Sequence, residues 1–188
     1  APALAEALRL FPSLPADFGG NRREVGAAEC RRLGELWEPD FVLLRRAGDG
    51  EFRLEGGCVC FPSAWRVTEK LGEVVHAIHE PVPTLNRELG ERIRRFLNQL
   101  QPGQIFEREN WGLAAHGELN GHPDRGLPRL GPTTPVGEVW LRVEHQAFVA
   151  LPESGGILFI IRLVVHPVSD VLAEPDAARD FVRMLRSM

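Results

Sequence analysis

Cysteine is scarce in this chain of 188 residues, which has three cysteines and no C-x-x-C pair. Without such a pair, a structural zinc site has no support in the sequence. Cys58 and Cys60 lie two residues apart, a spacing that rarely satisfies disulfide geometry along a strand. We therefore expect buried, free thiols of the kind found in proteins of the reducing cytoplasm.

Long apolar runs and an excess of basic residues are also missing. No run is long enough to span a bilayer, and the first residues, APALAEALRLFP, have neither the basic region nor the long apolar segment of a signal peptide. Lys and Arg total 22 against 26 acidic residues, which gives a net charge of −4. This balance argues against nucleic acid or an anionic membrane surface as a partner, and we expect a cytoplasmic protein.

Helices and strands are both predicted in the N-terminal part of the chain. A helix-like stretch near 24–37 is followed by two strands, in FVLLRR (41–46) and GGCVCF (56–61), which the turn AGDG separates. A helix is then predicted from 85 to 100, which QPG ends, because apolar residues recur at helical spacing on one face: Leu85, Leu89, Ile93, Phe96, Leu97 and Leu100. We regard residues 1–40 as a helical extension.

Strands dominate the C-terminal part. They are predicted at 104–113, 138–152 and 155–167. A terminal helix starts near Pro175, and its apolar face consists of Ala177, Phe181, Leu185 and Met188. The hairpin signal LPESGG makes the last two strands antiparallel neighbours, and the continuously apolar last strand should be central in the sheet. The loop 114–136 is dense in Gly and Pro, as functional or mobile loops are. Grouped strands with helices around them predict an α+β fold.

Two histidines, His76 and His79, lie three residues apart in VVHAIHEPVP. Because Pro81 disfavours helical conformation in the residue before it, a helix here must end near Glu80. His79 would then lie in the last turn, where the helix dipole favours its charged form. The alternative is a neutral imidazole that serves as the axial ligand of a haem iron. Another kind of metal site would need companion carboxylates or cysteines, which the sequence does not offer.

The strand EVWLRVEHQAF has an unusual polar face. Period-two geometry places three polar groups and two flanking aromatics on one side: Trp140, Arg142, Glu144, Gln146 and Phe148. This set is either a solvated sheet face, on which an Arg–Glu pair contributes little, or the lining of a ligand pocket. On the next strand, Arg162 is the only charge within ILFIIRLVV. A buried charge needs a partner, and Glu144 across the hairpin is one candidate.

The segment FERENW offers a further polar pair. Arg108 and Asn110 share one side of this predicted strand, and Trp111 lies on the other. Because Arg presents a planar fork of donors, such a pair could bind a carboxylate or a propionate. An ordinary edge strand is the alternative, and for this segment alone we prefer it.

Several short motifs then occur together in a characteristic order: CFPSAW, EKLG, IHEPVP, REN-W, LRVEHQ with LP, and ILFIIR. In this order and spacing, from about Cys58 to Val165, the sequence resembles the haem-binding alpha subunit of the haem-dependent oxidative N-demethylases. The resemblance implies a single haem-binding domain over residues 1–188, with a Per-ARNT-Sim-like antiparallel sheet, helices around it and a bound haem b. It also implies oxidation of a small secondary amine, dimethylamine, with dioxygen and NADPH-derived electrons.

The resemblance implies roles for particular residues. His79 matches the iron ligand, with His76 as the second choice, and Glu144 and Arg162 would be the catalytic residues. Four others would contact the cofactor or substrate: Arg108, Asn110, Trp111 and Arg142. Because the chain has neither a G-x-G-x-x-G fingerprint nor a four-cysteine cluster site, electrons would come from a separate reductase.

Two other functions stay open at this point. One is a haem-binding domain without turnover, such as a gas or redox sensor. This reading gains weight from His145, which stands in LRVEHQ where we expect an Arg in the family. The other is a small-ligand-binding domain without haem, whose pocket the residues of the polar strand face would line.

Overall fold

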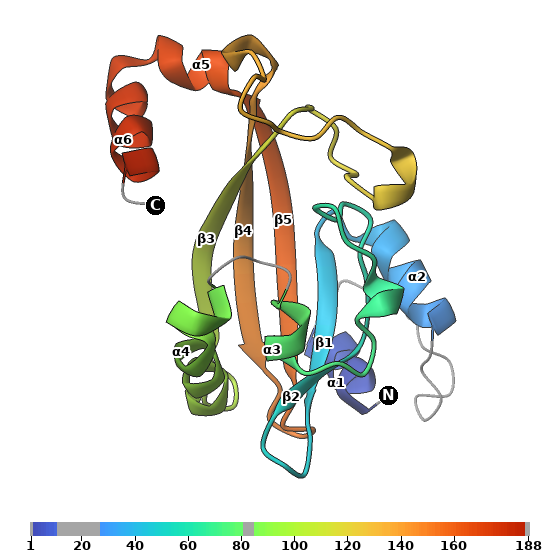
Figure 1. Ribbon diagram of the computed structural model, residues 1–188. Helices are drawn as coiled ribbons and strands as arrows, with labels where there is room; N and C mark the ends of the chain where they lie inside the picture. Colours follow the sequence, from blue (N-terminus) through green and yellow to red (C-terminus); the bar gives the residue numbers. More distant parts are fainter. Residues whose placement is uncertain (1, 11–26, 81–84, 187–188) are drawn as a thin grey trace. The chain divides into compact units, whose positions relative to one another are not determined.

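The structure is a computed structural model that describes residues 2–10, 27–80 and 85–186 (Figure 1). The helices and strands are, in chain order, α1 (Pro2–Leu10), α2 (Ala27–Leu36), β1 (Asp40–Arg46), β2 (Phe52–Cys58), α3 (Val75–Ile78), α4 (Leu85–Gln99), β3 (Ile105–Ala114), β4 (Trp140–Ala150), β5 (Ile157–Pro167), α5 (Val168–Ala173) and α6 (Pro175–Arg186). Among the described ranges, no helix combines the length and the apolar character that crossing a membrane requires.

The five strands form one antiparallel sheet in the order β2-β1-β5-β4-β3. The α+β prediction is therefore confirmed. β5 is the central strand and β4 is its neighbour, as the apolar run and the hairpin signal predict. β3 lies at the edge. The second strand was predicted at 56–61, but β2 runs from Phe52 to Cys58 and so lies earlier in the chain.

Strand β1 pairs with β2 on one side and with β5 on the other, and it carries apolar side chains on both faces of the sheet. Phe41 is opposite Ile160 of β5 and Cys58 of β2, and a register shift between Leu43 and Leu44 interrupts the pairing with β2. Side chains alternate between the two faces of a strand. β1 is buried over its first five residues, so both of its faces must be covered.

The described residues divide into two compact units, which we treat separately. The first includes residues up to 60, 66–108 and 146–162, and the second includes 61–65, 109–145 and 163–186. Strands β3, β4 and β5 each contribute residues to both.

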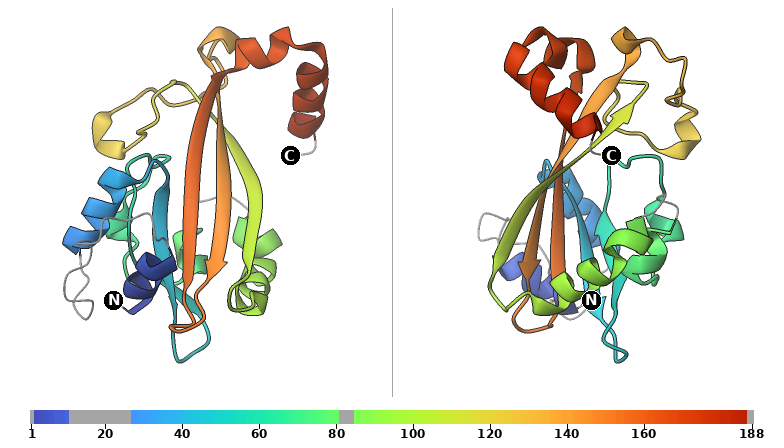
Figure 2. Two further views of the ribbon diagram at one scale, coloured as in Figure 1. Left: turned by 180° about the vertical axis from the view of Figure 1, so that it is seen from behind. Right: turned by 60° about the vertical axis from the view of Figure 1, so that its left-hand side comes forward.

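In the first unit, α1 and α2 cover one face of the sheet (Figure 2). The core on this side consists of Ala3, Ala5, Ala7, Cys30, Leu33, Phe41, Leu43, Val149, Leu151 and Leu158, with Trp37, Cys58 and Ile160 packed against it. Part of the stretch predicted as a helix near 24–37 forms α2, and its residues 24–26 lie outside the described ranges.

Helices α3 and α4 cover the other face of the first unit (Figures 1 and 2). Leu97 is buried there, with Ile93, Phe96 and Leu100 beside it, so the predicted apolar stripe of this helix does face the sheet. Leu89, which we expected on the same stripe, is 39% exposed. The sheet contributes Val42, Leu44, Phe52, Leu54, Phe148 and Ile157 to this second core.

The second unit contains the predicted terminal helix, α6, which begins at Pro175 as expected. Phe181 of this helix is buried, and the centre of its ring lies 6.1 Å from the centre of the Trp111 ring. Leu185, predicted for the same face, is 39% exposed, and Met188 lies outside the described residues. The short helix α5 has no counterpart in the predictions. It starts at the buried Val168, whose backbone N–H donates to the carbonyl of Val139 at 2.9 Å.

Candidate functional site

His79 ends a helix of only four residues. α3 runs from Val75 to Ile78, and His79 is its C-cap, with φ −86° and ψ −6°. The backbone N–H of His79 donates to the carbonyl of Val75 at 3.2 Å. The helix therefore stops next to Glu80, as the proline at position 81 predicts, although that proline lies outside the described residues.

The His79 side chain is half-buried, and its surroundings favour the neutral form. Burial lowers its pKa, and the positive charges of Arg108 and Lys70 lower it further. Its Nδ1 is enclosed and has no hydrogen-bond partner among the described residues. An enclosed imidazole nitrogen without a partner is costly, and it is the kind of atom that a ligand satisfies. Of the two predicted states, this environment favours the neutral imidazole over the charged C-cap.

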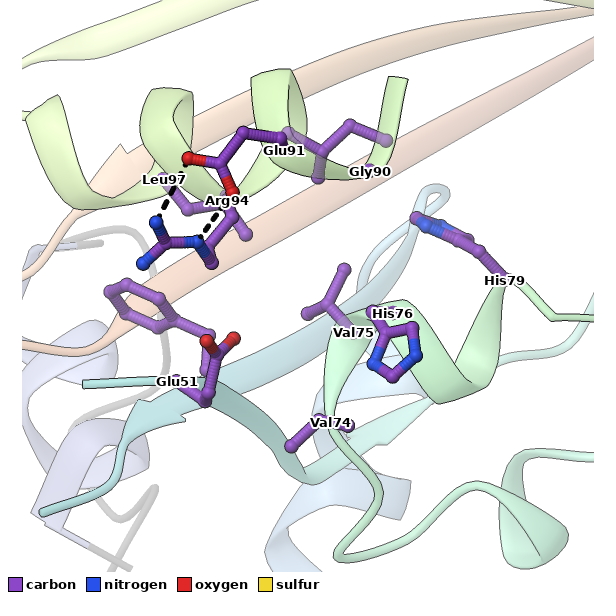
Figure 3. Close-up of a pocket in the computed structure, with 11 residues that line it drawn as sticks. Glu51, Val74, Val75, His76, His79, Gly90, Glu91, Arg94 and Leu97 are labelled. Carbon is purple, nitrogen blue, oxygen red and sulfur yellow. Dashed lines mark hydrogen bonds and ion pairs between the residues drawn. The ribbon is translucent and has the colours of Figure 1, made fainter. Parts of the chain in front are cut away.

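A pocket of about 380 Å³ lies beside this histidine, within the size range of small-ligand sites. Its lining comprises Glu51, Phe52, Val74, Val75, His76, His79, Gly90, Glu91, Ile93, Arg94 and Leu97. Figure 3 shows the two histidines on the α3 side and the Glu91–Arg94 pair on α4. Arg94 donates to both carboxylate oxygens of Glu91 at 2.9 Å, in a bidentate pair. His76 is exposed, unlike the half-buried His79.

Arg108 is held on the same side of the sheet by two contacts within the first unit. Its Nε donates to Oε1 of Gln146 at 2.7 Å, and its guanidinium carbon lies 5.2 Å from the centre of the Phe148 ring. Gln146 is only 6% exposed. Arg108 is thus a fixed positive charge that opposes protonation of His79. Gln146 was not among our predicted site residues, although its position on the polar face of β4 pointed to it.

In the second unit, Arg142 is buried and holds the loop after β3. It donates to the carbonyls of Glu118 and Leu119, at 2.7 and 2.9 Å, and to Oγ of Ser63 at 3.3 Å. Arg142 is 6% exposed, so of the two alternatives for this strand face, the solvated face does not hold for this residue. Its Nε is also enclosed and finds no partner in the part of the chain that is described. Burial lowers the pKa of Arg142, and the nearby Glu144 partly counters this effect.

The other predicted residues of the second unit make looser contacts. Nδ2 of Asn110 lies 3.4 Å from Oε2 of Glu144, which is half-buried. His145, on the opposite side of β4, is exposed and lies 3.2 Å from Glu109. Trp111 packs against Phe181 of α6.

Arg162 has a different partner from the one that we suggested. Its Nε donates to Oε1 of Glu38 at 3.1 Å, and both side chains are more than half exposed. The apolar surroundings of Arg162 in the sequence suggested burial. Its side chain instead reaches solvent, so it needs no buried counter-charge.

The structure thus combines an α+β fold, in which helices cover an antiparallel sheet, with a half-buried imidazole of lowered pKa beside a pocket, which makes His79 a candidate metal ligand. The family model described as "Haem-dependent oxidative N-demethylase, alpha subunit-like" matches residues 21–188, and the chain belongs to this family. The resemblance drawn from the short motifs is thus confirmed. Membership implies dependence on haem and a place in an oxidase of more than one subunit.

The residues at the pocket fit such a cofactor. Within the described ranges, no three His, Cys, Asp or Glu side chains gather as they would around an isolated metal ion. A porphyrin supplies most of the ligands of its iron itself, so the protein would need to offer only one side chain to hold it. The enclosed Nδ1 of His79, which has no hydrogen-bond partner in the described part of the chain, marks the side chain suited to that role.

Proposed function

We propose that this chain is a haem-binding subunit that holds haem b through His79 and oxidises a small secondary amine, such as dimethylamine. Dioxygen would be the oxidant, and a separate reductase would supply electrons. We also propose that the whole chain acts as one domain of Per-ARNT-Sim type. The observation that carries the proposal is the neutral, half-buried His79, whose enclosed Nδ1 has no partner among the described residues, next to a pocket of about 380 Å³.

Several residues of the first unit have a role in binding. His79 would offer a nitrogen lone pair to the iron, which requires the neutral ring that its surroundings favour. Arg108, fixed by Gln146, would keep that ring from taking up a proton. The apolar lining residues Val75, Ile93 and Leu97 would exclude water. Arg94, on the α4 wall, would pair with a carboxylate of the porphyrin in place of Glu91.

Bound haem would supply the chemistry of oxygen activation. The overall reaction consumes the amine, dioxygen, two electrons and two protons, and it gives formaldehyde, water and the amine shortened by one methyl group. Glu144 would hold the protonated amine through a charge-assisted hydrogen bond and take up its proton at a carboxylate oxygen. Asn110, whose Nδ2 lies 3.4 Å from Oε2 of Glu144, would orient that carboxylate.

The remaining predicted residues carry less of the proposal. We still propose that Arg142 and Trp111 contact the cofactor and that Arg162 is a catalytic residue. Arg142 is already committed to two backbone carbonyls, and Arg162 to Glu38. We therefore base the tests on His79 and Glu144.

Titration of the cofactor-free chain with haemin, followed in the Soret region, tests the binding role. His79→Ala should lose the wild-type Soret position and bind haemin at least tenfold more weakly. His76→Ala is the matched control, because His76 lies three residues away on the same pocket wall and is exposed. Its spectrum should equal that of the wild type. A His79→Ala protein with an unchanged spectrum would remove the ligand assignment.

Formaldehyde release from dimethylamine, with oxygen and an artificial electron donor, tests the catalytic role. The haem-loaded wild type should release formaldehyde in step with oxygen uptake. Glu144→Gln should lower that rate at least tenfold and raise the KM for the amine, since its side chain no longer carries a charge. Glu109→Gln, which removes an exposed carboxylate paired with His145, is the control. A haem-loaded wild type that releases none would indicate a sensor or storage role.

A further inference from the structure

The two neighbouring cysteines of the first unit lie closer together than their spacing in the sequence suggests. Sγ of Cys58 and Sγ of Cys60 are 3.8 Å apart, and both thiols are free. The sequence argument against a bond between them assumed a continuous strand through both residues. β2 instead ends at Cys58, so Cys60 lies beyond the strand and its side chain can turn back.

Surrounding contacts hold the two thiols in this arrangement. The backbone N–H of Cys60 donates to Oδ1 of the buried Asp40 at 2.7 Å, which fixes the chain after the strand. Helix α2 lies directly behind Cys58. A Cβ atom at Gly34 would lie 2.2 Å from Sγ of Cys58, so only glycine leaves room for this thiol.

The two thiols differ in accessibility. Cys60 is exposed, whereas Cys58 is half-buried. Burial, with a further contribution from Cys60, raises the pKa of Cys58 to about 12. Since the thiolate is the nucleophile, Cys60 is the thiol that can react first with a molecule from solution, and Cys58 is placed to act second.

We propose that Cys58 and Cys60 form a reversible disulfide when the chain meets a small-molecule disulfide such as oxidised glutathione. Cys60, as the thiolate, attacks one sulfur of that oxidant, the bond between the oxidant's sulfurs breaks, and one thiol leaves. Cys58 then loses its proton to solvent and attacks Sγ of Cys60, which expels the second thiol. The two cysteines are oxidised by two electrons, and the small disulfide is reduced to two thiols.

The closing step requires a modest movement. The two sulfurs must approach from 3.8 Å to a bond length of about 2.05 Å. A ring closed between residues two apart is strained, and strained, accessible disulfides are the ones most easily reduced again. The pair is therefore suited to reversible oxidation and not to permanent cross-linking.

Peptide mass spectrometry after equilibration of the folded chain with oxidised glutathione tests this proposal. Trypsin releases residues 54–66 as one peptide with both cysteines, while Cys30 falls in another. After alkylation of the remaining thiols, we expect this peptide unalkylated and lighter by two hydrogens. Alkylatable thiols in the denatured chain should fall from three to one. Excess reduced glutathione should restore all of them.

Single variants identify the order of the steps. Cys58→Ser should stop at a stable glutathione adduct on Cys60, and Cys60→Ser should leave Cys58 fully alkylatable. Cys30→Ala is the matched control and should close the ring like the wild type. A wild-type peptide that keeps two alkylated cysteines, retains the glutathione adduct, or is found linked to a second chain would overturn the proposal. The wild-type result decides the matter even where a variant does not fold.

Discussion

Helices α1 and α2 close one face of the sheet in the first unit with an apolar core, whereas the face beneath α3 and α4 also contains polar side chains and a pocket. Phe41 and Leu158 on the closed face are 0% exposed. On the other face, Phe148 lies under the guanidinium of Arg108, and the buried amide of Gln146 accepts from it. Both faces use the same strands, so side-chain alternation gives one sheet a close-packed side and a side with polar groups and a pocket.

The difference shows where this fold can accept a ligand. A close-packed apolar face gains stability from every buried side chain and has no room for another molecule. The other face, with the half-buried His79, the fixed Arg108 and a pocket, fully buries fewer of the described apolar side chains and gains less stability. It holds polar groups in defined positions instead. Substitutions on the two faces should therefore affect different measurements.

Phe41→Ala should have the largest effect on stability, because it empties a fully enclosed site on the closed face. We expect a loss of about 3–5 kcal/mol in the free energy of unfolding, measured by urea denaturation. Phe96→Ala, on the pocket face, should cost less, because that ring is only partly buried. Equal losses would contradict the contrast between the faces.

Arg108→Met should have an intermediate effect. It leaves the buried amide of Gln146 without this hydrogen bond, at a cost of about 1–3 kcal/mol in the free energy of unfolding. It should also raise the pKa of His79, because one positive charge near the ring is gone. NMR titration of the His79 ring protons in the cofactor-free chain measures this shift. A double variant with Gln146→Leu should recover part of the lost stability, and an unchanged His79 pKa would contradict the role of Arg108.

Acid should destabilise the pocket face through His79. Its pKa in the folded chain lies below the ordinary value of 6.5, so between the two values the unfolded chain binds a proton that the folded chain does not. The free energy of unfolding should therefore fall as the pH drops through about 6.5. In His79→Gln the same decrease should be shallower, when denaturation curves at pH 7.5 and 5.5 are compared. Parallel decreases in both proteins would show that His79 is not the group responsible.

Arg162→Ala should have the smallest effect. Its ion pair with Glu38 is exposed, and such pairs contribute about 0–1 kcal/mol. We expect a change in the free energy of unfolding near the lower end of that range, and a haemin titration like that of the wild type. A large drop in formaldehyde release from this variant, with haem binding intact, would instead support the catalytic role that the sequence suggested.

Local patterns in the sequence were enough to predict much of the fold. The spacing of Ile93, Phe96 and Leu97 predicted α4, and the apolar run of β5 predicted the central strand. The helix α5 was missed because it is short and begins directly at the end of β5, where the sequence gives no separate periodic signal. The position of β2 was shifted because the prediction followed the apolar residues of GGCVCF and missed the alternation before them, in which Phe52 and Leu54 are buried.

The site was less predictable because its contacts join distant parts of the chain. Proline spacing pointed to His79, a local signal, but its neutral state depends on burial and on Arg108. No local pattern indicates that Arg142 holds the carbonyls of Glu118 and Leu119. Nor does any indicate that Arg162 reaches Glu38. Such pairings depend on register and on loop paths, which the sequence determines only through the whole fold.

The central claim is that His79 binds the iron, and chemical replacement of its side chain tests it most directly. His79→Gly removes the imidazole and leaves space beside the pocket, so free imidazole should be able to enter. We predict that the haem-loaded variant lacks the wild-type Soret band and regains it when imidazole is added. A His79→Gly spectrum that already equals the wild type before imidazole is added would contradict the claim.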